Sequence, residues 1–158
     1  QDNELSWLDW AHCDEDMLAF TRRIIAFRRE HAAFHRSDFF DGQWSPTTGL
    51  PDVAWLEGDG TLLCHDEWHN PARASFGALL SGKPPMVLIF NRSSLASNFT
   101  LPGTDDCTWT PVFDTSLPAS APAPEPSPGG GKTTVNGHSL VCLALHTGPL
   151  GLTTACTV

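Results

Sequence analysis

The chain has 158 residues, of which 41% are hydrophobic, and it contains six Trp and nine Phe. This size and composition predict one folded domain, or one domain with an appendage, and argue against intrinsic disorder. The formal net charge of −9 argues against nucleic acids and membranes as partners, because phosphate binding needs clustered Lys and Arg. The longest apolar run, 86–90, is too short to span a bilayer.

The five cysteines are widely spaced and form no C-x-x-C pair. This usage predicts buried or idle thiols in a reducing compartment, not a disulfide framework. Two N-x-[ST] sequons begin at Asn91 and Asn98, and without a recognisable signal peptide we interpret both as unused.

The first elements in chain order are a loop and a helix. Residues 1–13 combine Trp, acids and amides, a mixture typical of a loop at a polar, ring-stacking site. From Asp14, a plausible N-cap, apolar residues recur at steps of three and four, which predicts an amphipathic helix over about 15–31. Four Arg are expected on its solvated side, and its apolar stripe comprises Met17, Leu18, Phe20, Ile24, Ile25 and Phe27.

Beyond Phe40 the helical period disappears, and short apolar runs alternate with Gly, Pro, Asn and Asp. Such spacing predicts an antiparallel β-sandwich. Between the expected strands 108–114 and 133–135, the segment 118–132 is rich in Pro, Ala and Gly, which predicts a mobile surface loop. The expected strands are 52–56, 75–80, 86–91, 98–101, 108–114, 133–135 and 139–145.

Several short motifs resemble nucleotide-binding, metal-binding or catalytic motifs, but the residues around them do not fit those functions. The Gly131-Lys132-Thr133 triplet follows a Pro-rich stretch and lacks the first glycine of a P-loop. The run HDEWH at 65–69 has two His four residues apart, yet Pro71 disfavours the α-helix that would bring them together, so a solvated loop is expected. No G-x-S-x-G element occurs, and no pair of carboxylates is singled out by spacing. We therefore predict no metal site and no cofactor.

Aromatic residues raise the question of sugar binding. Trp44, Trp55, Trp68 and Trp109 are expected mainly as core or interface residues, which is the usual place of Trp in a small domain. Trp7 and Trp10 differ, because they flank acids in an irregular segment.

Two stretches of the chain are distinctive, the opening QDNELSWLDW and the later DEWHNPARASFGALLSG. They resemble the QDNE-x-SWLDW signature and the D-W-x-x-P-x-A-R-S-x-x-x-x-L-x-G segment of the isoamylase-type glycogen and starch debranching enzymes of the α-amylase superfamily. These two motifs are fairly specific. More generic similarities are LAFTRRIIAFRREHAAF, DVAWLEGDG, NRSSLASNFTLPG and WTPVFDT, so the resemblance extends to about residue 145.

The resemblance implies a mainly β fold, in which a C-terminal antiparallel β-sandwich follows the last loop and helix of a (β/α)8 barrel. The expected divisions are 1–40 for the end of the barrel, 41–147 for the sandwich, 118–132 for its Pro-rich loop and 148–158 for a tail that can fray. The family cleaves α-1,6 branch linkages with carboxylates that lie upstream of this segment, so no catalytic residue is expected here. Barrel-rim loops carry substrate contacts. The expected glucan-binding residues are therefore Gln1, Asp2, Asn3 and Trp7, and a role in fixing the rim loop is an equal alternative.

Further expectations follow from the same resemblance. The partners would be a branched α-glucan (glycogen, amylopectin or limit dextrin), the upstream barrel, and further subunits in a homo-oligomer. The location would be the bacterial cytoplasm or the plastid stroma of algae or plants. Two alternatives of another class stay open, an autonomous sandwich that binds glucan through surface Trp and a protein-interaction module. Two or more solvent-facing, coplanar Trp rings would favour the glucan-binding alternative.

Overall fold

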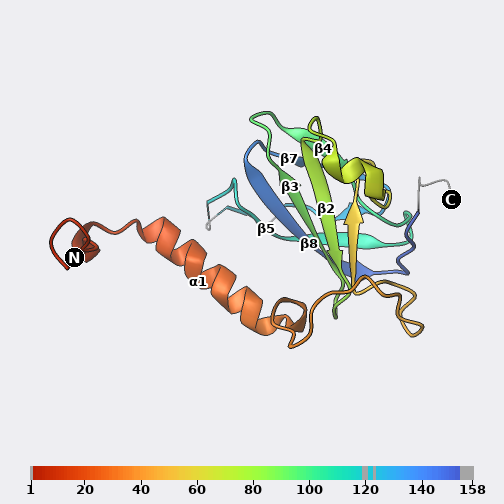
Figure 1. Ribbon diagram of the computed structural model, residues 1–158, viewed down its shortest axis with the longest axis horizontal. Coiled ribbons are helices and arrows are strands. Elements are labelled where there is room, and N and C mark those ends of the chain that lie inside the picture. The colour runs from red at the N-terminus through yellow and green to blue at the C-terminus, as the bar shows by residue number, and fades with distance from the viewer. Residues whose placement is uncertain (1, 119–120, 123, 154–158) are drawn as a thin grey trace.

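The computed structural model describes residues 2–118, 121–122 and 124–153, which form an N-terminal arm and a β-sandwich (Figure 1). The arm contains the 3-10 helix η1 (Trp10–His12), the α-helix α1 (Glu15–Glu30) and the 3-10 helix η2 (Ala32–Phe34). A third 3-10 helix, η3 (His65–His69), lies in the sandwich. The strands are β1 (Val53–Leu56), β2 (Ser75–Leu80), β3 (Met86–Asn91), β4 (Ser97–Thr100), β5 (Thr108–Asp114), β6 (Ser127–Pro128), β7 (Lys132–Val135) and β8 (Ser139–Thr147).

The predicted helix is present and ends one residue earlier than expected, at Glu30. Its N-cap is Asp14, whose Oδ1 accepts a hydrogen bond of 2.9 Å from the amide of Met17. Acids in the first turn and Arg28 and Arg29 in the last turn both complement the helix dipole. All four arginines of the helix are exposed, as the amphipathic pattern predicted.

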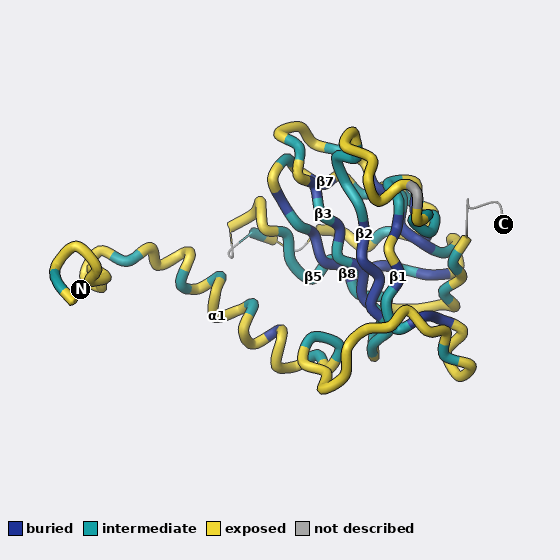
Figure 2. The backbone as a smooth tube through the Cα atoms, in the orientation of Figure 1, coloured by how far each residue is buried: buried dark blue, intermediate teal, exposed yellow. Residues whose placement is uncertain are grey.

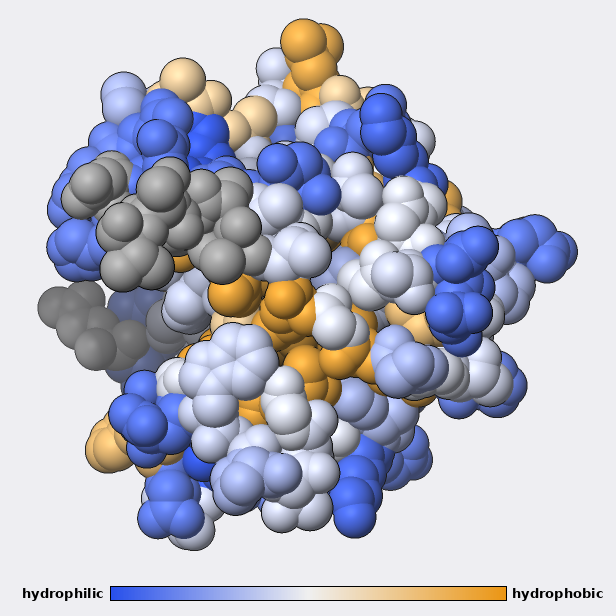
Figure 3. All heavy atoms as spheres, turned by 90° about the vertical axis from the view of Figure 1, so that its right-hand side faces the viewer, coloured by the Kyte–Doolittle hydropathy of each residue, from blue (hydrophilic) through white to orange (hydrophobic). Residues whose placement is uncertain are grey.

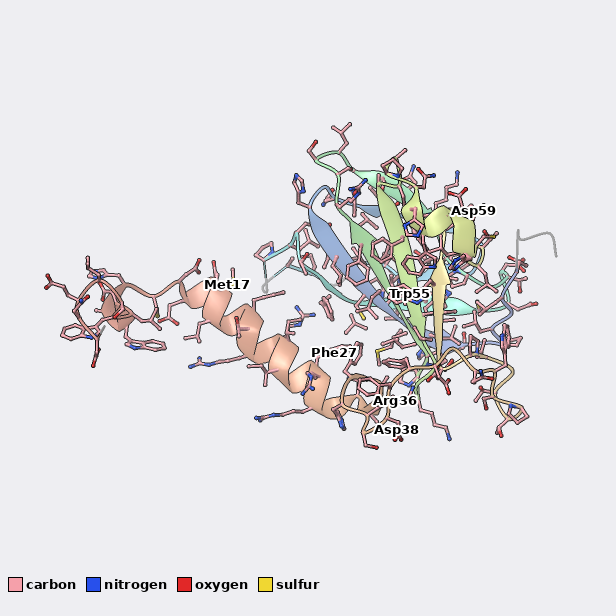
Figure 4. All side chains as sticks on the ribbon, viewed as in Figure 1. Met17, Phe27, Arg36, Asp38, Trp55 and Asp59 are labelled. Atoms are coloured by element: carbon pink, nitrogen blue, oxygen red, sulfur yellow. The ribbon has the colours of Figure 1, made fainter. Side chains whose placement is uncertain are left out.

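The helix is only partly covered by the rest of the structure (Figure 2). Within α1, whose residues are all described, only Phe27 is buried, and its ring contacts Phe34 and Phe113 with centroid distances of 5.2 Å each. Met17 and Ile25, in the same apolar stripe, are 59% and 48% exposed. Figure 4 shows Phe27 beside the sandwich and Met17 far along the arm. The stripe is therefore buried mainly near the C-terminal end of the helix.

The sandwich consists of a six-stranded sheet and a two-stranded sheet, and every strand pairing is antiparallel. The larger sheet has the order β1-β2-β3-β8-β5-β6, and the smaller sheet pairs β4 with β7. The last long strand, β8, lies between β3 and β5, so it joins the first three strands to the later ones. The prediction of a mainly β, antiparallel sandwich is confirmed.

The main core lies between the two sheets. Trp109 and Phe99 are fully buried there, and Trp109 Nε1 donates a hydrogen bond of 2.9 Å to the Pro102 carbonyl oxygen. Gly77 on β2 makes room for this packing, because a Cβ atom at that position would lie 2.8 Å from Phe99 Cζ. The opposite, outer face of the six-stranded sheet carries a smaller cluster around Phe27, Met86 and Cys142, on which the end of α1 rests.

Two features depart from the expected element pattern. The segment 118–132, predicted as a loop, contains β6, which pairs with Thr108 and Trp109 of β5. The run HDEWH, expected as a loop, forms the short 3-10 helix η3. This helix ends two residues before Pro71, so the proline does not interrupt it. The remaining strands agree with the predicted ranges to within two residues.

The described part of the tail is attached to the sandwich, whereas the sequence predicted that it could fray. Leu150 and Leu152 pack against the inner core, and the Leu62 amide donates a hydrogen bond of 2.9 Å to the Thr153 carbonyl. Viewed from the side on which the C-terminal end lies, apolar side chains gather at the centre of the face and hydrophilic side chains surround them (Figure 3).

The cysteine prediction is wrong at one position. Cys64 is disulfide-bonded, whereas Cys13, Cys107 and Cys142 are free thiols. Cys107 and Cys142 are buried in apolar surroundings and behave there as small hydrophobic residues. Wide spacing in the sequence does not reveal which cysteines the fold brings together.

Candidate functional site

The N-terminal segment predicted to bind glucan forms a small, ordered loop at the far end of the arm (Figure 1). Of the four predicted residues, Gln1 lies outside the described residues, and Asp2, Asn3 and Trp7 come together. Asp2 Oδ1 accepts a hydrogen bond of 2.6 Å from Trp7 Nε1. Asn3 Oδ1 accepts a bond of 3.1 Å from the Leu5 amide, which closes a local turn.

These contacts leave a ring face and polar groups available. The Trp7 side chain is 64% exposed, although its indole N–H is held by Asp2. A shallow hollow of about 400 Å³ lies between the loop residues, lined by Asp2, Asn3, Glu4, Leu5 and Trp7. A fixed indole beside carboxylate and amide groups can stack on a pyranose ring and hydrogen-bond its hydroxyls.

The neighbouring residues Asp9 and Trp10 have different surroundings. Asp9 is the N-cap of η1, where its carboxylate accepts hydrogen bonds from the Ala11 amide at 3.1 Å and from His12 Nδ1 at 2.8 Å. Trp10 is exposed. The geometry therefore gives Asp9 a capping role, and it gives Trp10 no packing role.

Three of the four sandwich tryptophans lie outside the core, whereas core or interface positions were expected. All six tryptophans of the chain are described, and of these only Trp109 is buried in the core. Trp44, Trp55 and Trp68 are all more than one third exposed. Trp55 and Trp68 meet edge to face, with centroids 5.2 Å apart and an interplanar angle of 78°. They do not form the coplanar pair that a flat stacking platform requires.

A second hollow, which the sequence did not reveal, lies between η3 and the outer face of the larger sheet. Its volume is about 300 Å³, and its walls include Trp68, His69, Arg73, Phe76 and Arg92. Sequence reasoning missed it because only the pairing of β2 with β3 brings Arg92 beside the other four residues, which lie within 68–76. The motif DEWHNPARASF, which contains four of the five, was the one available signal.

Two further features are absent from the part of the chain that the structure describes. No group of three or more His, Cys, Asp or Glu side chains among these residues is placed to hold a metal ion. No helix among them is long and apolar enough to cross a membrane.

The relatives found by comparison with known proteins have related names. No family model matches the chain. The chain is 35% identical over 86 residues to the glycogen operon protein GlgX homolog of Mycobacterium tuberculosis, covering 52% of this chain and 12% of that protein. It is 34% identical over 102 residues to the glycogen debranching enzyme of Dickeya chrysanthemi, covering 65% and 14%.

A third relative matches over most of the chain at lower identity. Isoamylase of Pseudomonas amyloderamosa is 27% identical over 161 aligned residues, which cover 90% of this chain and 19% of that protein. The chain thus spans less than one fifth of the length of each of these relatives. The resemblance predicted from the motifs is confirmed: this chain is homologous to one part of the isoamylase-type debranching enzymes.

Proposed function

We propose that the chain is the C-terminal segment of a glycoside hydrolase that cleaves α-1,6 branch linkages in glycogen or starch. The observation that carries this proposal is its similarity to proteins named glycogen debranching enzyme and isoamylase, of which it matches a small fraction. Retaining glycoside hydrolysis uses two carboxyl groups about 5 Å apart. In this proposal they belong to an upstream barrel, and the present residues supply rim and scaffold.

The shape of the arm supports an upstream partner within the same protein. The apolar stripe of α1 is left partly uncovered at Met17 and Ile25, and Leu5, Leu8 and Trp10 are exposed before it. Apolar groups exposed in such number lower stability or solubility unless another surface covers them. A barrel that precedes the segment would cover the stripe and place the loop with Asp2, Asn3 and Trp7 beside its glucan site.

The test is hydrolysis of amylopectin by this chain and by the same chain extended upstream through the barrel, with new reducing ends as the readout. We expect cleavage with the extended protein only. A linear maltooligosaccharide, which lacks α-1,6 linkages, is the control and should release nothing. Cleavage of amylopectin by the 158-residue chain would overturn the assignment of the carboxylates to the upstream region.

A role for the loop in substrate binding has its own test. In the extended protein, Trp7→Ala should raise KM for amylopectin about fivefold to tenfold, because a ring-stacking contact is lost. Trp44→Ala, which removes another exposed indole of the sandwich, is the matched control and should leave KM unchanged. An unchanged KM in Trp7→Ala would leave the loop with the alternative role of fixing the rim.

A stand-alone glucan-binding module is a second candidate function. It is favoured by the exposure of five of the six tryptophans, all of which are described, since exposed aromatic rings are the usual contacts of sugars. The edge-to-face arrangement of Trp55 and Trp68 argues against a flat platform. Binding of glycogen by this chain, with no cleavage even after upstream extension, would favour the module.

A further inference from the structure

The hollow between η3 and the larger sheet combines fixed aromatic rings with an unpaired cation, on the outer face of the sandwich. It is separated from the loop containing Trp7 by the whole length of α1 (Figure 1). Nothing in the proposed catalytic role uses it.

The two aromatic residues that line the hollow, Trp68 and Phe76, belong to a connected row of rings. Trp68 contacts Trp55, Trp55 lies 6.1 Å from Phe76, and Phe76 stacks on Phe90 at 4.9 Å and 14°. The register explains the row, because Phe76 and Phe90 are paired across β2 and β3, and Trp55 is paired with Ala78, two residues along the same face. The rings support one another, while Trp55 and Trp68 remain 39% and 43% exposed. Figure 4 shows Trp55 on the sheet.

The polar side of the hollow is formed by two arginines with different surroundings. Arg73 is neutralised, because its guanidinium contacts Glu57 at 2.7 Å and Glu67 at 3.4 Å. Arg92 instead donates from Nε to the Arg73 carbonyl at 2.7 Å and from Nη2 to the Pro71 carbonyl. No carboxylate whose position the structure describes lies within salt-bridge distance of Arg92. Two carbonyl groups therefore orient its guanidinium, and further N–H donors stay available to a ligand.

This combination fits a neutral, hydroxyl-rich ligand with apolar faces. Pyranose rings present C–H faces to aromatic rings, and their hydroxyls accept hydrogen bonds from guanidinium groups. An anionic ligand is disfavoured, because Glu57 and Glu67 already neutralise Arg73, only Arg92 is left unpaired in the lining, and the net charge of the chain is −9. A volume of about 300 Å³ is at the lower end for small-ligand pockets.

The angle between Trp55 and Trp68 bears on whether an α-1,4- or a β-1,4-linked glucan fits the hollow. Coplanar aromatic rings suit the flat ribbon of a β-1,4-glucan, whereas an α-1,4-glucan curves, so that successive sugar rings are inclined to one another. Trp68 lines the hollow, and Trp55, which lies against Trp68 and Phe76 beside it, is inclined to Trp68 by 78°. We propose that this hollow, with Trp68 as the stacking ring and Arg92 as the hydrogen-bond donor, binds a linear α-1,4-linked arm of the branched glucan. The proposal rests on the proposed function, because the substrate of a debranching enzyme supplies such arms.

The test is isothermal titration of the 158-residue chain with maltoheptaose, a linear α-1,4 probe, and with cellohexaose as the β-1,4 comparison. We expect binding of maltoheptaose and at least tenfold weaker binding of cellohexaose. Trp68→Ala should weaken maltoheptaose binding about fivefold to tenfold. Arg92→Gln, which retains a side-chain N–H donor but removes the guanidinium, should weaken it measurably. Circular dichroism melts of both variants verify that the sandwich is still folded.

A control variant separates this hollow from other aromatic surfaces. Trp44→Ala removes an exposed indole elsewhere on the sandwich and should bind maltoheptaose like the unmodified chain. Unchanged binding in folded Trp68→Ala and Arg92→Gln would overturn the proposal, as would equal binding of cellohexaose.

The binding assay and the hydrolysis assay can fail separately. Binding that depends on Trp68 without amylopectin cleavage by the extended protein would support the hollow and overturn the debranching function. Cleavage by the extended protein without maltoheptaose binding by this chain would support the function and overturn the hollow as a glucan site.

Discussion

Asn91 connects the end of β3 to two loops through one buried side chain. Its Nδ2 donates hydrogen bonds to the carbonyl oxygens of Leu95, Val135 and Asn136 at 2.8, 3.0 and 3.1 Å. Its Oδ1 accepts bonds from the amide and hydroxyl of Ser93. The amide nitrogen that a glycan would require is thus fully used inside the fold, which gives a physical reason for interpreting this sequon as unused.

The Asn91→Ala substitution should lower the free energy of unfolding by about 2–4 kcal/mol, because buried carbonyl groups lose their donor. Urea denaturation followed by Trp fluorescence measures the change. Asn98→Ala, in the exposed sequon on β4, is the matched control and should change stability by less than about 0.5 kcal/mol. Equal effects of the two substitutions would contradict the role assigned to the Asn91 network.

The thiols should differ strongly in reactivity. Burial raises the pKa of the Cys142 thiol to about 12, so its reactive thiolate is scarce at neutral pH. Cys13 is only partly buried. In the native chain we expect a thiol reagent to label Cys13 within minutes and to leave Cys107 and Cys142 unlabelled until urea unfolds the sandwich. Mass spectrometry of labelled peptides measures this, and prior reduction should add Cys64 to the labelled set. Rapid native labelling of Cys142 would contradict its burial.

At the scale of elements, residues with a clear local signal were predictable. Asp14 as N-cap, acids in the first turn and arginines in the last turn identify α1 as a helix. The short apolar run Met86–Asn91, which follows turn residues, identifies β3 as a strand. The strand β6 was not predictable, since Ser127 and Pro128 have low strand propensity and pair only where β5 offers an edge. The fold class could therefore be predicted from the sequence, and this short pairing could not.

The Asp52 carboxylate holds the segment between η2 and β1 in place through several hydrogen bonds. Asp52 accepts hydrogen bonds from Arg36 Nη1 at 2.7 Å, from the Gly42 amide at 2.9 Å and from the Asp41 amide at 3.3 Å. Burial by itself would raise the pKa of this carboxyl, but the bonds from Arg36, Gly42 and Asp41 outweigh burial and hold the pKa below its ordinary value. The charged form is thus favoured in the folded chain.

This lowered pKa predicts a pH-dependent effect of Asp52→Asn. The carboxylate contributes stability above about pH 4, the unfolded pKa, and that contribution is lost as the pH falls through the lower folded pKa. Asp52→Asn should therefore lower the urea midpoint at pH 7, and the difference from the unmodified chain should shrink below about pH 3. Asp38→Asn, in the same segment, is the control. A difference independent of pH would show that the charge of Asp52 is not responsible.

At the scale of the whole molecule, the arm and the sandwich differ in how much of their surface is covered (Figure 2). The exposed arginines of α1 should make the arm the first target of trypsin, because a poorly packed helix opens locally more often than a sheet core. We expect early cuts after Arg22, Arg23, Arg28 or Arg29, identified by mass spectrometry, and a persistent fragment that contains β1 to β8. Early cuts after Arg92 or Lys132 would contradict this order of stability. In urea all these sites should be cut at similar rates.

The candidate sites were predictable to different degrees. The loop with Asp2, Asn3 and Trp7 is contiguous in sequence, so a motif could point to it. The hollow at Trp68 and Arg92 joins η3 to the ends of β2 and β3, and only their antiparallel register brings those residues together. The exposure of Trp55 was not foreseen for a related reason, since a hydrophobic residue on a strand shows its type but not which face of the sheet remains uncovered.

The central position of β8 also determines when this sheet can be completed during synthesis. The strand pairs with β3 through Met86–Asn91 and with β5 through Thr108–Asp114, yet it is the last strand of the described chain. On the ribosome, β1 to β3 can form a hairpin-linked unit early, but β5 has no neighbour on its β8 side until residue 147 has left the exit tunnel. Closure across such long sequence separations is slow. During that interval the nascent chain exposes the unpaired edges of β3 and β5, and it is then that chaperones would be most needed.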